Sequence, residues 1–290
     1  MHKTPRLAGP WVNVYQPQPA TYPGPDSPTF RAGQRYESWV PNDFTVLAGP
    51  DGRWHALGIT HPEGGATVHE AEWLAFHAAA PVGAFAEHLH VGAWEQMPHL
   101  LPPGERPGER PELWAPFCYA HEDTYYLYYG PTEMRLATSN DLYHWQPQGV
   151  VFGGEEGARD PCVVWHHGRH LMVYIAGHTL YARESDDLRH WDERRVIYTL
   201  DRPGSPESPY LVLRPEGNYL FYCIYDGTNT DYDDRTSVLF SETVDFTQAP
   251  VVAELRAHAP EVICDECGDW YLASVERPYR GVSVAPLAWV

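Results

Sequence analysis

Five short turn motifs recur along the chain, and their polar side chains are the ones that could do chemistry. The motifs are Asn42-Asp43-Phe44, Trp114-Ala115-Pro116, Arg159-Asp160-Pro161, Glu207-Ser208-Pro209 and His258-Ala259-Pro260-Glu261. If the repeats surround one axis, their carboxylates meet in one pocket, where burial costs free energy unless the groups are paired or serve a purpose. Glycosidic bond cleavage needs such a set, because one carboxylic acid protonates the leaving oxygen while a second carboxylate activates water or attacks the sugar.

Each motif opens a repeat of similar design. Two β-rich runs joined by a glycine-containing turn follow each motif, over 41–60, 114–130, 159–177, 207–223 and 258–274. A third run follows each hairpin, at 76–85, 136–145, 181–191, 238–246 and 282–289. Four strands in ~45–60 residues, repeated around an axis, are typical of propeller blades. The sequence therefore predicts an all-β fold, a five-bladed β-propeller with four-stranded antiparallel blades around a central funnel. A solenoid would have a shorter and stricter period, and an irregular β-sandwich would leave the repeat unexplained.

The repeats leave a proline-rich segment at the N-terminus. We expect residues 1–36 to form an arm that wraps or closes the propeller, and residues 37–290 to form the propeller itself. Because an open propeller leaves an exposed strand edge, we expect Trp11–Tyr15 to pair with or cover the terminal blade. The stretch 86–112 is expected to be a loop between blades 1 and 2, and Glu70–Ala80 a strand, with no helix of any length.

Composition limits the class of partner. The 290 residues carry a net charge of −19, with 43% hydrophobic and 20% charged residues. This acidity argues against nucleic acid or an anionic membrane as the main partner. No apolar run reaches the ~18–20 residues of a membrane span, and the N-terminus lacks the apolar core of a secretory signal. We expect a cytoplasmic protein, and the sequence does not indicate its oligomeric state.

One cysteine pair has the spacing of a metal or redox motif. Cys264-Asp265-Glu266-Cys267 lies in the expected turn of the fifth hairpin, and no second pair follows at ligand spacing. The sequence therefore predicts no metal site there. Since nucleotide and metal motifs are absent from the sequence, we expect no required cofactor.

Four residues of the motifs are candidates for substrate binding. Trp114 offers a flat face for a sugar ring, and Asn42 stands beside Asp43. Arg159 is expected to contact sugar hydroxyls, with pairing to a neighbouring carboxylate as the alternative. His258 could bind sugar, hold an ion on the axis or cap a strand, and the sequence does not separate these roles.

The repeats and their motifs resemble the five-bladed propeller glycosidases of glycoside hydrolase families 43 and 32, over residues 37–290. The resemblance implies that Asp43 is the base or nucleophile and that Glu207 is the general acid. It implies that Asp160 tunes the acid and stabilises the transition state. It also implies small oligosaccharide substrates and, as in some relatives, a structural Ca²⁺ on the axis that His258 could hold through water.

The match departs from the family pattern at two positions. Phe44 stands where the common Asp-Pro of blade 1 has its proline, and Phe117 replaces an acidic residue that often follows Trp-Ala-Pro. Asn-Asp in blade 1 and Arg-Asp-Pro in blade 3 resemble family 32. Glu-Ser-Pro and the lack of a C-terminal β-sandwich resemble family 43. We therefore expect furanose or pentose substrates such as arabinosides, xylosides or fructosides, and cleavage with inversion.

Two other functions remain open at the level of the sequence. A non-catalytic carbohydrate-binding propeller could keep the pocket, although the intact Asp43, Asp160 and Glu207 favour an enzyme. A glycoside phosphorylase on the same fold would need a cluster of Arg or His for phosphate, and only Arg159 and His258 stand near the funnel.

Overall fold

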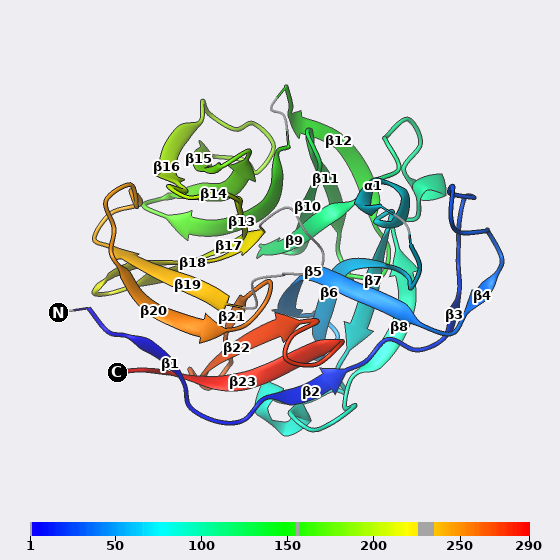
Figure 1. Cartoon of the computed structure of the whole chain (residues 1–290), viewed down its shortest axis with the longest axis horizontal. Helices are drawn as coiled ribbons and strands as arrows, with labels where there is room; N and C mark the ends of the chain where they lie inside the picture. Colours follow the sequence, from blue (N-terminus) through cyan, green and yellow to red (C-terminus); the bar gives the residue numbers. More distant parts are fainter. Residues whose placement is uncertain (1, 66, 155–156, 226–234) are drawn as a thin grey trace.

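Five antiparallel sheets surround a common axis in the computed structural model, as Figure 1 shows. The structure describes residues 2–65, 67–154, 157–225 and 235–290. The predicted all-β, five-bladed propeller is confirmed. None of the helices in these residues is long and apolar enough to cross a membrane.

The strands of each blade follow one another in the sequence. Blade 1 consists of β5 (Trp39–Ala48), β6 (Trp54–Pro62), β7 (Leu74–Ala79) and β8 (Glu95–Leu100). Blade 2 consists of β9 (Trp114–His121), β10 (Thr124–Gly130), β11 (Met134–Ser139) and β12 (Gln146–Phe152). Blade 3 consists of β13 (Arg159–His166), β14 (Arg169–Ala176), β15 (Thr179–Ser185) and β16 (Arg195–Thr199). Blade 4 consists of β17 (Ser205–Arg214), β18 (Gly217–Tyr225), β19 (Arg235–Ser241) and β20 (Val251–Arg256). Blade 5 contains β21 (Glu261–Cys264), β22 (Trp270–Val275) and β23 (Val282–Trp289).

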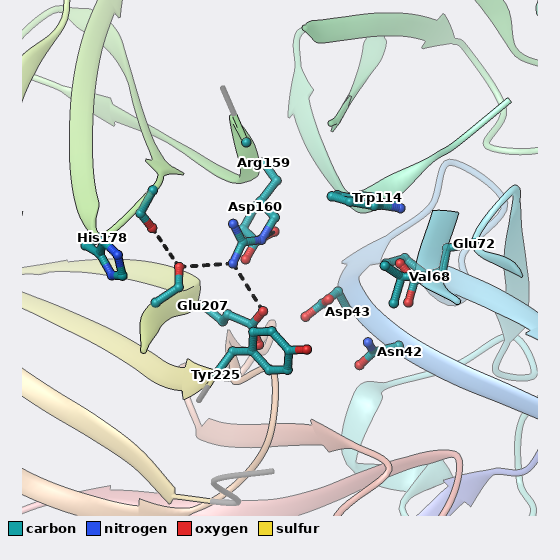
Figure 2. A pocket seen from close by; sticks show the side chains of 14 residues that line it. Asn42, Asp43, Val68, Glu72, Trp114, Arg159, Asp160, His178, Glu207 and Tyr225 are labelled. Carbon is teal, nitrogen blue, oxygen red and sulfur yellow. Dashed lines mark hydrogen bonds and ion pairs between the residues drawn. The ribbon is translucent and has the colours of Figure 1, made fainter. Parts of the chain in front are cut away.

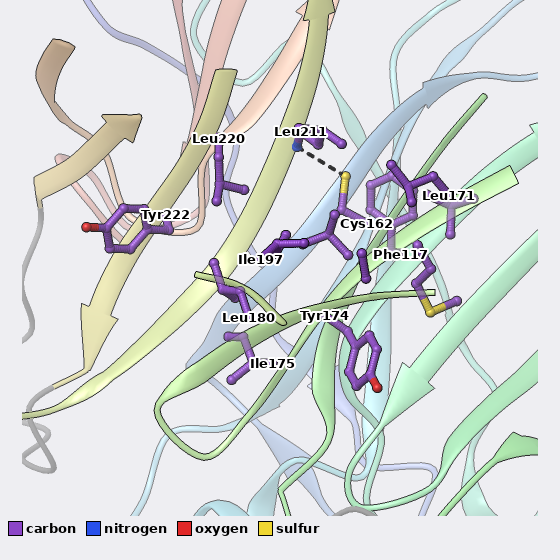
Figure 3. Packing of buried hydrophobic residues seen from close by; sticks show 14 of the residues in the cluster. Phe117, Cys162, Leu171, Tyr174, Ile175, Leu180, Ile197, Leu211, Leu220 and Tyr222 are labelled. Carbon is purple, nitrogen blue, oxygen red and sulfur yellow. Dashed lines mark hydrogen bonds between the residues drawn. The ribbon is translucent and has the colours of Figure 1, made fainter. Parts of the chain in front are cut away.

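The hairpins and the core between the blades follow from the pattern of the sequence. His167 and Gly168, which join β13 to β14, both have positive φ, as a two-residue hairpin turn requires. The apolar side chains of blades 2, 3 and 4 pack into one large cluster, part of which Figure 3 shows. Within it Cys162 is buried and accepts a hydrogen bond from the Leu211 amide at 3.4 Å, as expected for a small hydrophobic side chain.

The ring is closed by the N-terminal segment. Blade 5 supplies three strands of its own, and β1 (Pro5–Leu7) and β2 (Val12–Tyr15) both pair antiparallel with β23. The pairing expected for Trp11–Tyr15 therefore occurs over β2. The inner strands contact one another around the ring, and β21 contacts β5 where the chain closes on itself. Both termini lie beside blade 5 (Figure 1). Two further short strands of this segment, β3 (Ala20–Thr21) and β4 (Arg35–Tyr36), pair with each other.

The stretch 86–112 is not the simple loop that the sequence predicted. It contains β8, the fourth strand of blade 1. The short 3₁₀ helix η1 (Phe85–His88) lies at the start of the stretch, and η2 (Pro103–Glu105) follows β8. Pro98 concealed this strand, since proline is confined to edge strands, and β8 is the edge of its blade.

The expectation of a continuous strand over Glu70–Ala80 is also wrong. A helical turn, α1 (Val68–Ala71), precedes β7. Thr67 and Glu70 form a capping box, the sequence signature of a helix start, and Thr67 lies three residues before Glu70 as that motif requires.

Ring closure predicts that the N-terminal segment stabilises the whole propeller. Deleting residues 1–20 should lower the melting temperature by several degrees, because it removes the strands that cover the edge of blade 5. Within β2, Val14→Ala should cost about 2 kcal/mol, since Val14 is 0% exposed and packs in the core between blades 5 and 1.

Val91→Ala is the matched control, because Val91 is 80% exposed and the same side chain is shortened. Thermal and denaturant unfolding of the three variants check this. An unchanged melting temperature after the deletion would contradict the closing role of the segment.

Candidate active site

A cavity of about 470 Å³ opens where the inner strands converge, and six of the seven sequence-predicted site residues line it. Figure 2 shows them around one space, and they come from the inner strands of blades 1 to 4. These six residues are Asn42, Asp43, Trp114, Arg159, Asp160 and Glu207. The volume is within the ~300–1,000 Å³ of small-molecule sites. The structure thus brings together residues that are up to 165 positions apart in the chain.

The motifs aim their side chains by the same local device. Ala115, Asp160, Ser208 and Ala259 each precede a proline and have φ between 42° and 54°. This left-handed conformation is costly for residues other than glycine and is found where the surroundings enforce it. In blades 3 and 4 the strand register shifts at the same point, so the backbone leaves the ladder and turns these side chains toward the axis.

Blade 1 reaches the same place without the proline. Phe44 follows Asp43, and the register between β5 and β6 shifts between Asn42 and Phe44. The replacement of proline by Phe44 therefore leaves Asp43 at the cavity, among the carboxylates of the other blades.

Arg159 is the cation that holds two of the three predicted carboxylates. Its Nη2 lies 3.2 Å from Oε1 of Glu207, and its Nε lies 3.5 Å from Oδ1 of Asp160. The same Nη2 donates a hydrogen bond to Ser205 Oγ at 3.1 Å. Of the two roles considered from the sequence, pairing with neighbouring carboxylates is the one seen in these contacts.

Ser208 links Asp43 to Asp160, a role that the sequence did not reveal. Its hydroxyl donates to Oδ1 of Asp43 at 2.6 Å, and its amide donates to Oδ2 of Asp160 at 2.9 Å. The signal was present in the repeat, because Asp43, Asp160 and Ser208 occupy the same place in their motifs. Two donors from one residue thus fix the relative orientation of both aspartates.

Crowding of buried carboxylates shifts their protonation. Burial, with repulsion from Asp160, raises the pKa of Asp43 to about 7, although Ser208 and Arg159 oppose the shift. Burial also raises the pKa of Glu207 to about 8, against the attraction of Arg159 and with repulsion from the two aspartates. For Asp160, burial raises the pKa while Arg159 and the Ser208 amide oppose it. Burial therefore favours the protonated form of all three carboxyls, relative to carboxyls exposed to water.

A fourth carboxylate, Glu72, also lines the cavity and was not predicted. It follows α1 in the segment between β6 and β7, and its side chain is buried. Tyr225 and His178 complete the polar lining that sequence reasoning missed. These residues stand outside the repeated motifs, so the repeat gave no signal for them.

His258 does not line the cavity. It is 1% exposed, and its Nε2 lies 3.1 Å from Oδ1 of Asn42, while its amide donates to Ser274 Oγ. The structure thus places His258 behind Asn42 as a support for that side chain.

A structural Ca²⁺ held by His258 through water stays a prediction. In the described ranges, one group of three side chains has ligand atoms close enough to share an ion, and it consists of Asp265, Glu266 and Cys267. This group lies at the turn between β21 and β22, and none of its members lines the cavity.

No protein-family model and no curated protein sequence matches the chain. Its structure is similar to a thermostable family-43 glycoside hydrolase, with a TM-score of 0.66 and 12% identity, covering 88% of this chain and 90% of that chain. The native Bacillus subtilis arabinanase gives a TM-score of 0.62 and 13% identity, covering 86% and 94%. The fold is that of the family 43 glycosidase propellers.

A further similar structure comes from GH130, a family of mannoside phosphorylases that contains glycoside hydrolases targeting β-1,2 mannosidic linkages. It has a TM-score of 0.64 and 14% identity, covering 96% of this chain and 93% of that chain. At such identities the similarity establishes the fold, and the chemistry must be argued from this chain's own site.

The raised pKa of Glu207 predicts how stability depends on pH. The folded protein holds a proton that the unfolded chain loses near its ordinary pKa, so the wild type loses stability as pH rises from about 4.5 to about 8. Glu207→Gln removes this loss. We expect its melting temperature relative to the wild type to rise between about pH 4 and about pH 9.

Glu242→Gln is the control, since Glu242 is an exposed carboxylate outside the cavity. Its difference from the wild type should stay constant over the same range. Parallel melting curves of wild type and Glu207→Gln at all pH values would mean that Glu207 is not held protonated.

Proposed function

We propose that the chain is a glycoside hydrolase that acts on short oligosaccharides of furanose or pentose type, such as arabinosides, xylosides or fructosides. The observation that carries this proposal is the convergence of Asp43, Asp160 and Glu207 on one cavity, where Ser208 holds the two aspartates and Arg159 holds Asp160 and Glu207. Carboxyl groups that face one cavity in different surroundings can divide the roles of base and acid.

In this proposal Glu207 donates its proton to the leaving oxygen as the glycosidic bond breaks. Asp43, ionised, takes a proton from the attacking water, and Ser208 orients its carboxylate by the 2.6 Å hydrogen bond. Asp160 keeps negative charge near Glu207 and so favours its protonated form, while Arg159 holds both side chains in place.

The sugar would lie between Trp114 and the carboxylates. Trp114 sits on the cavity wall and presents a ring for stacking against the sugar. Asn42, held by His258, offers a fixed amide beside Asp43. These contacts support a small oligosaccharide as the substrate.

A phosphorylase is the second candidate, because of the similarity to the GH130 structure. Phosphate would need free cationic groups in the cavity. Among the described lining residues, Arg159 is engaged by Asp160 and Glu207, and His178 bonds the Gly204 carbonyl.

A panel of nitrophenyl glycosides and fructans, assayed with and without phosphate, separates a hydrolase, a phosphorylase and a sugar-binding module. Phosphate-independent release supports hydrolysis, strict dependence on phosphate supports the phosphorylase, and sugar binding without turnover supports a binding module.

The roles of the two carboxyls predict different responses to the leaving group. Glu207→Gln should lower turnover about 10²–10⁴-fold on natural glycosides, because general acid catalysis usually contributes a rate enhancement of this size. The loss should be much smaller on dinitrophenyl glycosides, whose leaving group needs no proton. Asp43→Asn should abolish activity on both, because its role does not depend on the leaving group.

Steady-state kinetics of both variants on both substrates check this assignment. Equal losses for the two variants on the two substrates, or a silent Glu207→Gln, would show that Glu207 is not the acid. The stereochemistry has its own measurement: we expect proton NMR to show an inverted anomer as the first product, and a retained anomer would contradict inversion.

A further inference from the structure

Glu72 is a buried carboxyl that the proposed mechanism does not use. It is 7% exposed and faces the same cavity as Asp43, Asp160 and Glu207. In Figure 2 it lies on the blade 1 side, beside Val68, with Glu207 on the opposite side of the view. It therefore stands at a wall of the pocket away from the acid that would protonate the leaving group.

The backbone holds Glu72 firmly in this place. Its amide donates to the Val68 carbonyl at 3.0 Å, and its own carbonyl accepts from the Leu113 amide at 2.8 Å. The second bond ties α1 to the residue before Trp114. The loop that follows β8 is itself anchored, since the buried Arg106 donates to the carbonyls of Leu101 and Trp73. Glu72 and Trp114 are thus fixed relative to each other.

No cationic side chain of the described residues forms an ion pair with Glu72. Among the ion pairs of the described residues it has no partner, whereas Arg159 is shared by Asp160 and Glu207. Burial raises the pKa of Glu72 well above its ordinary value, and repulsion from the other three carboxyls adds to the shift. The Asn42 side chain opposes this shift of the pKa of Glu72, but it is neutral and carries no charge to balance the carboxylate.

The contacts behind Glu72 allow its protonated carboxyl oxygen to donate a hydrogen bond into the cavity. His258 bonds the Asn42 oxygen, which turns the amide group of Asn42 toward Glu72 as a donor. One carboxyl oxygen of Glu72 can accept that hydrogen bond. The other oxygen, carrying the proton, is then a donor toward whatever the cavity holds. Asp43 at the same wall acts as an acceptor when ionised, so the two groups are complementary.

We propose that Glu72 is a specificity-determining residue, which as a neutral carboxylic acid donates a hydrogen bond to a hydroxyl of the bound sugar on its blade 1 side. This inference rests on the proposed glycoside hydrolase function and names the substrate as one with an uncharged hydroxyl at that edge. A buried donor of this kind selects against analogues that lack the oxygen, because it is then left unpaired.

The test compares two variants of similar size. Glu72→Gln keeps a donor, and Glu72→Leu does not. On the glycoside that the wild type cleaves best, Glu72→Gln should stay within about threefold of the wild-type kcat/KM, whereas Glu72→Leu should lose about 10–100-fold, mainly through KM. On the deoxy analogue that lacks the contacted hydroxyl, wild type and Glu72→Leu should differ by less than about threefold.

Glu70→Gln is the matched control, because it changes the same residue type in the helix that Glu72 follows, outside the cavity. Glutamine also satisfies the capping box, so this variant should behave as the wild type. An equal loss for Glu72→Gln and Glu72→Leu would show that an ionised carboxylate is needed. The same loss on every deoxy analogue, or a preference for amino sugars, would also overturn the proposal.

Binding of free monosaccharides, measured by calorimetry on the wild type, Glu72→Gln and Glu72→Leu, separates this inference from the proposed function. If sugars bind with the predicted order of variants but no glycoside is cleaved, the role of Glu72 stands and hydrolysis fails. If glycosides are cleaved but Glu72→Leu binds and cleaves them as the wild type does, hydrolysis stands and the role of Glu72 fails. If the wild type neither binds sugars nor cleaves glycosides, both fail.

Discussion

One arginine among the four carboxyls that line the cavity is the constraint on which the site depends. Arg159 is shared by Asp160 and Glu207, while Asp43 and Glu72 face the same cavity and form no ion pair among the described residues. A single positive charge cannot keep four neighbouring carboxyls ionised in a site removed from water. Protons must therefore stay in the cavity near neutral pH, and the hydrogen bonds decide where they stay. The Ser208 hydroxyl favours the ionised form of Asp43. Among the described residues, Asn42 is the side chain that favours the ionised form of Glu72.

The propeller supplies the rigidity that such crowding requires. Asp43, Asp160 and Glu207 approach the axis from different strands and Glu72 from the segment after α1, so repulsion among them acts to push the blades apart. The pairing of β1 and β2 with β23 closes the ring against that force. Left-handed residues at the motifs add local strain, and they persist because the rest of each inner strand is paired with the next strand of its blade.

Much of this arrangement followed from the repeat in the sequence. The five motifs located the inner strands, and convergence on the axis then brought six of the seven predicted residues to one cavity. The failures have physical causes. Pro98 concealed the edge strand β8, and a four-residue helix is too short for hydrophobic periodicity to reveal. Glu72 stands outside the motifs, and its burial depends on contacts with a loop some 40 residues away, which no local pattern records. His258 was in the correct motif, but the side chain of Asn42 lies between it and the cavity.

We infer that Glu207 holds a proton near neutral pH because of its buried, carboxyl-rich surroundings. Difference infrared spectra between wild type and Glu207→Gln, recorded across a pH titration, measure that proton directly through the carbonyl stretch of a protonated carboxyl. We expect this band to be present at neutral pH and to disappear with a midpoint near 8. A spectrum with only an ionised carboxylate at pH 7, and a midpoint near the ordinary value of ~4.3 for glutamate, would contradict it.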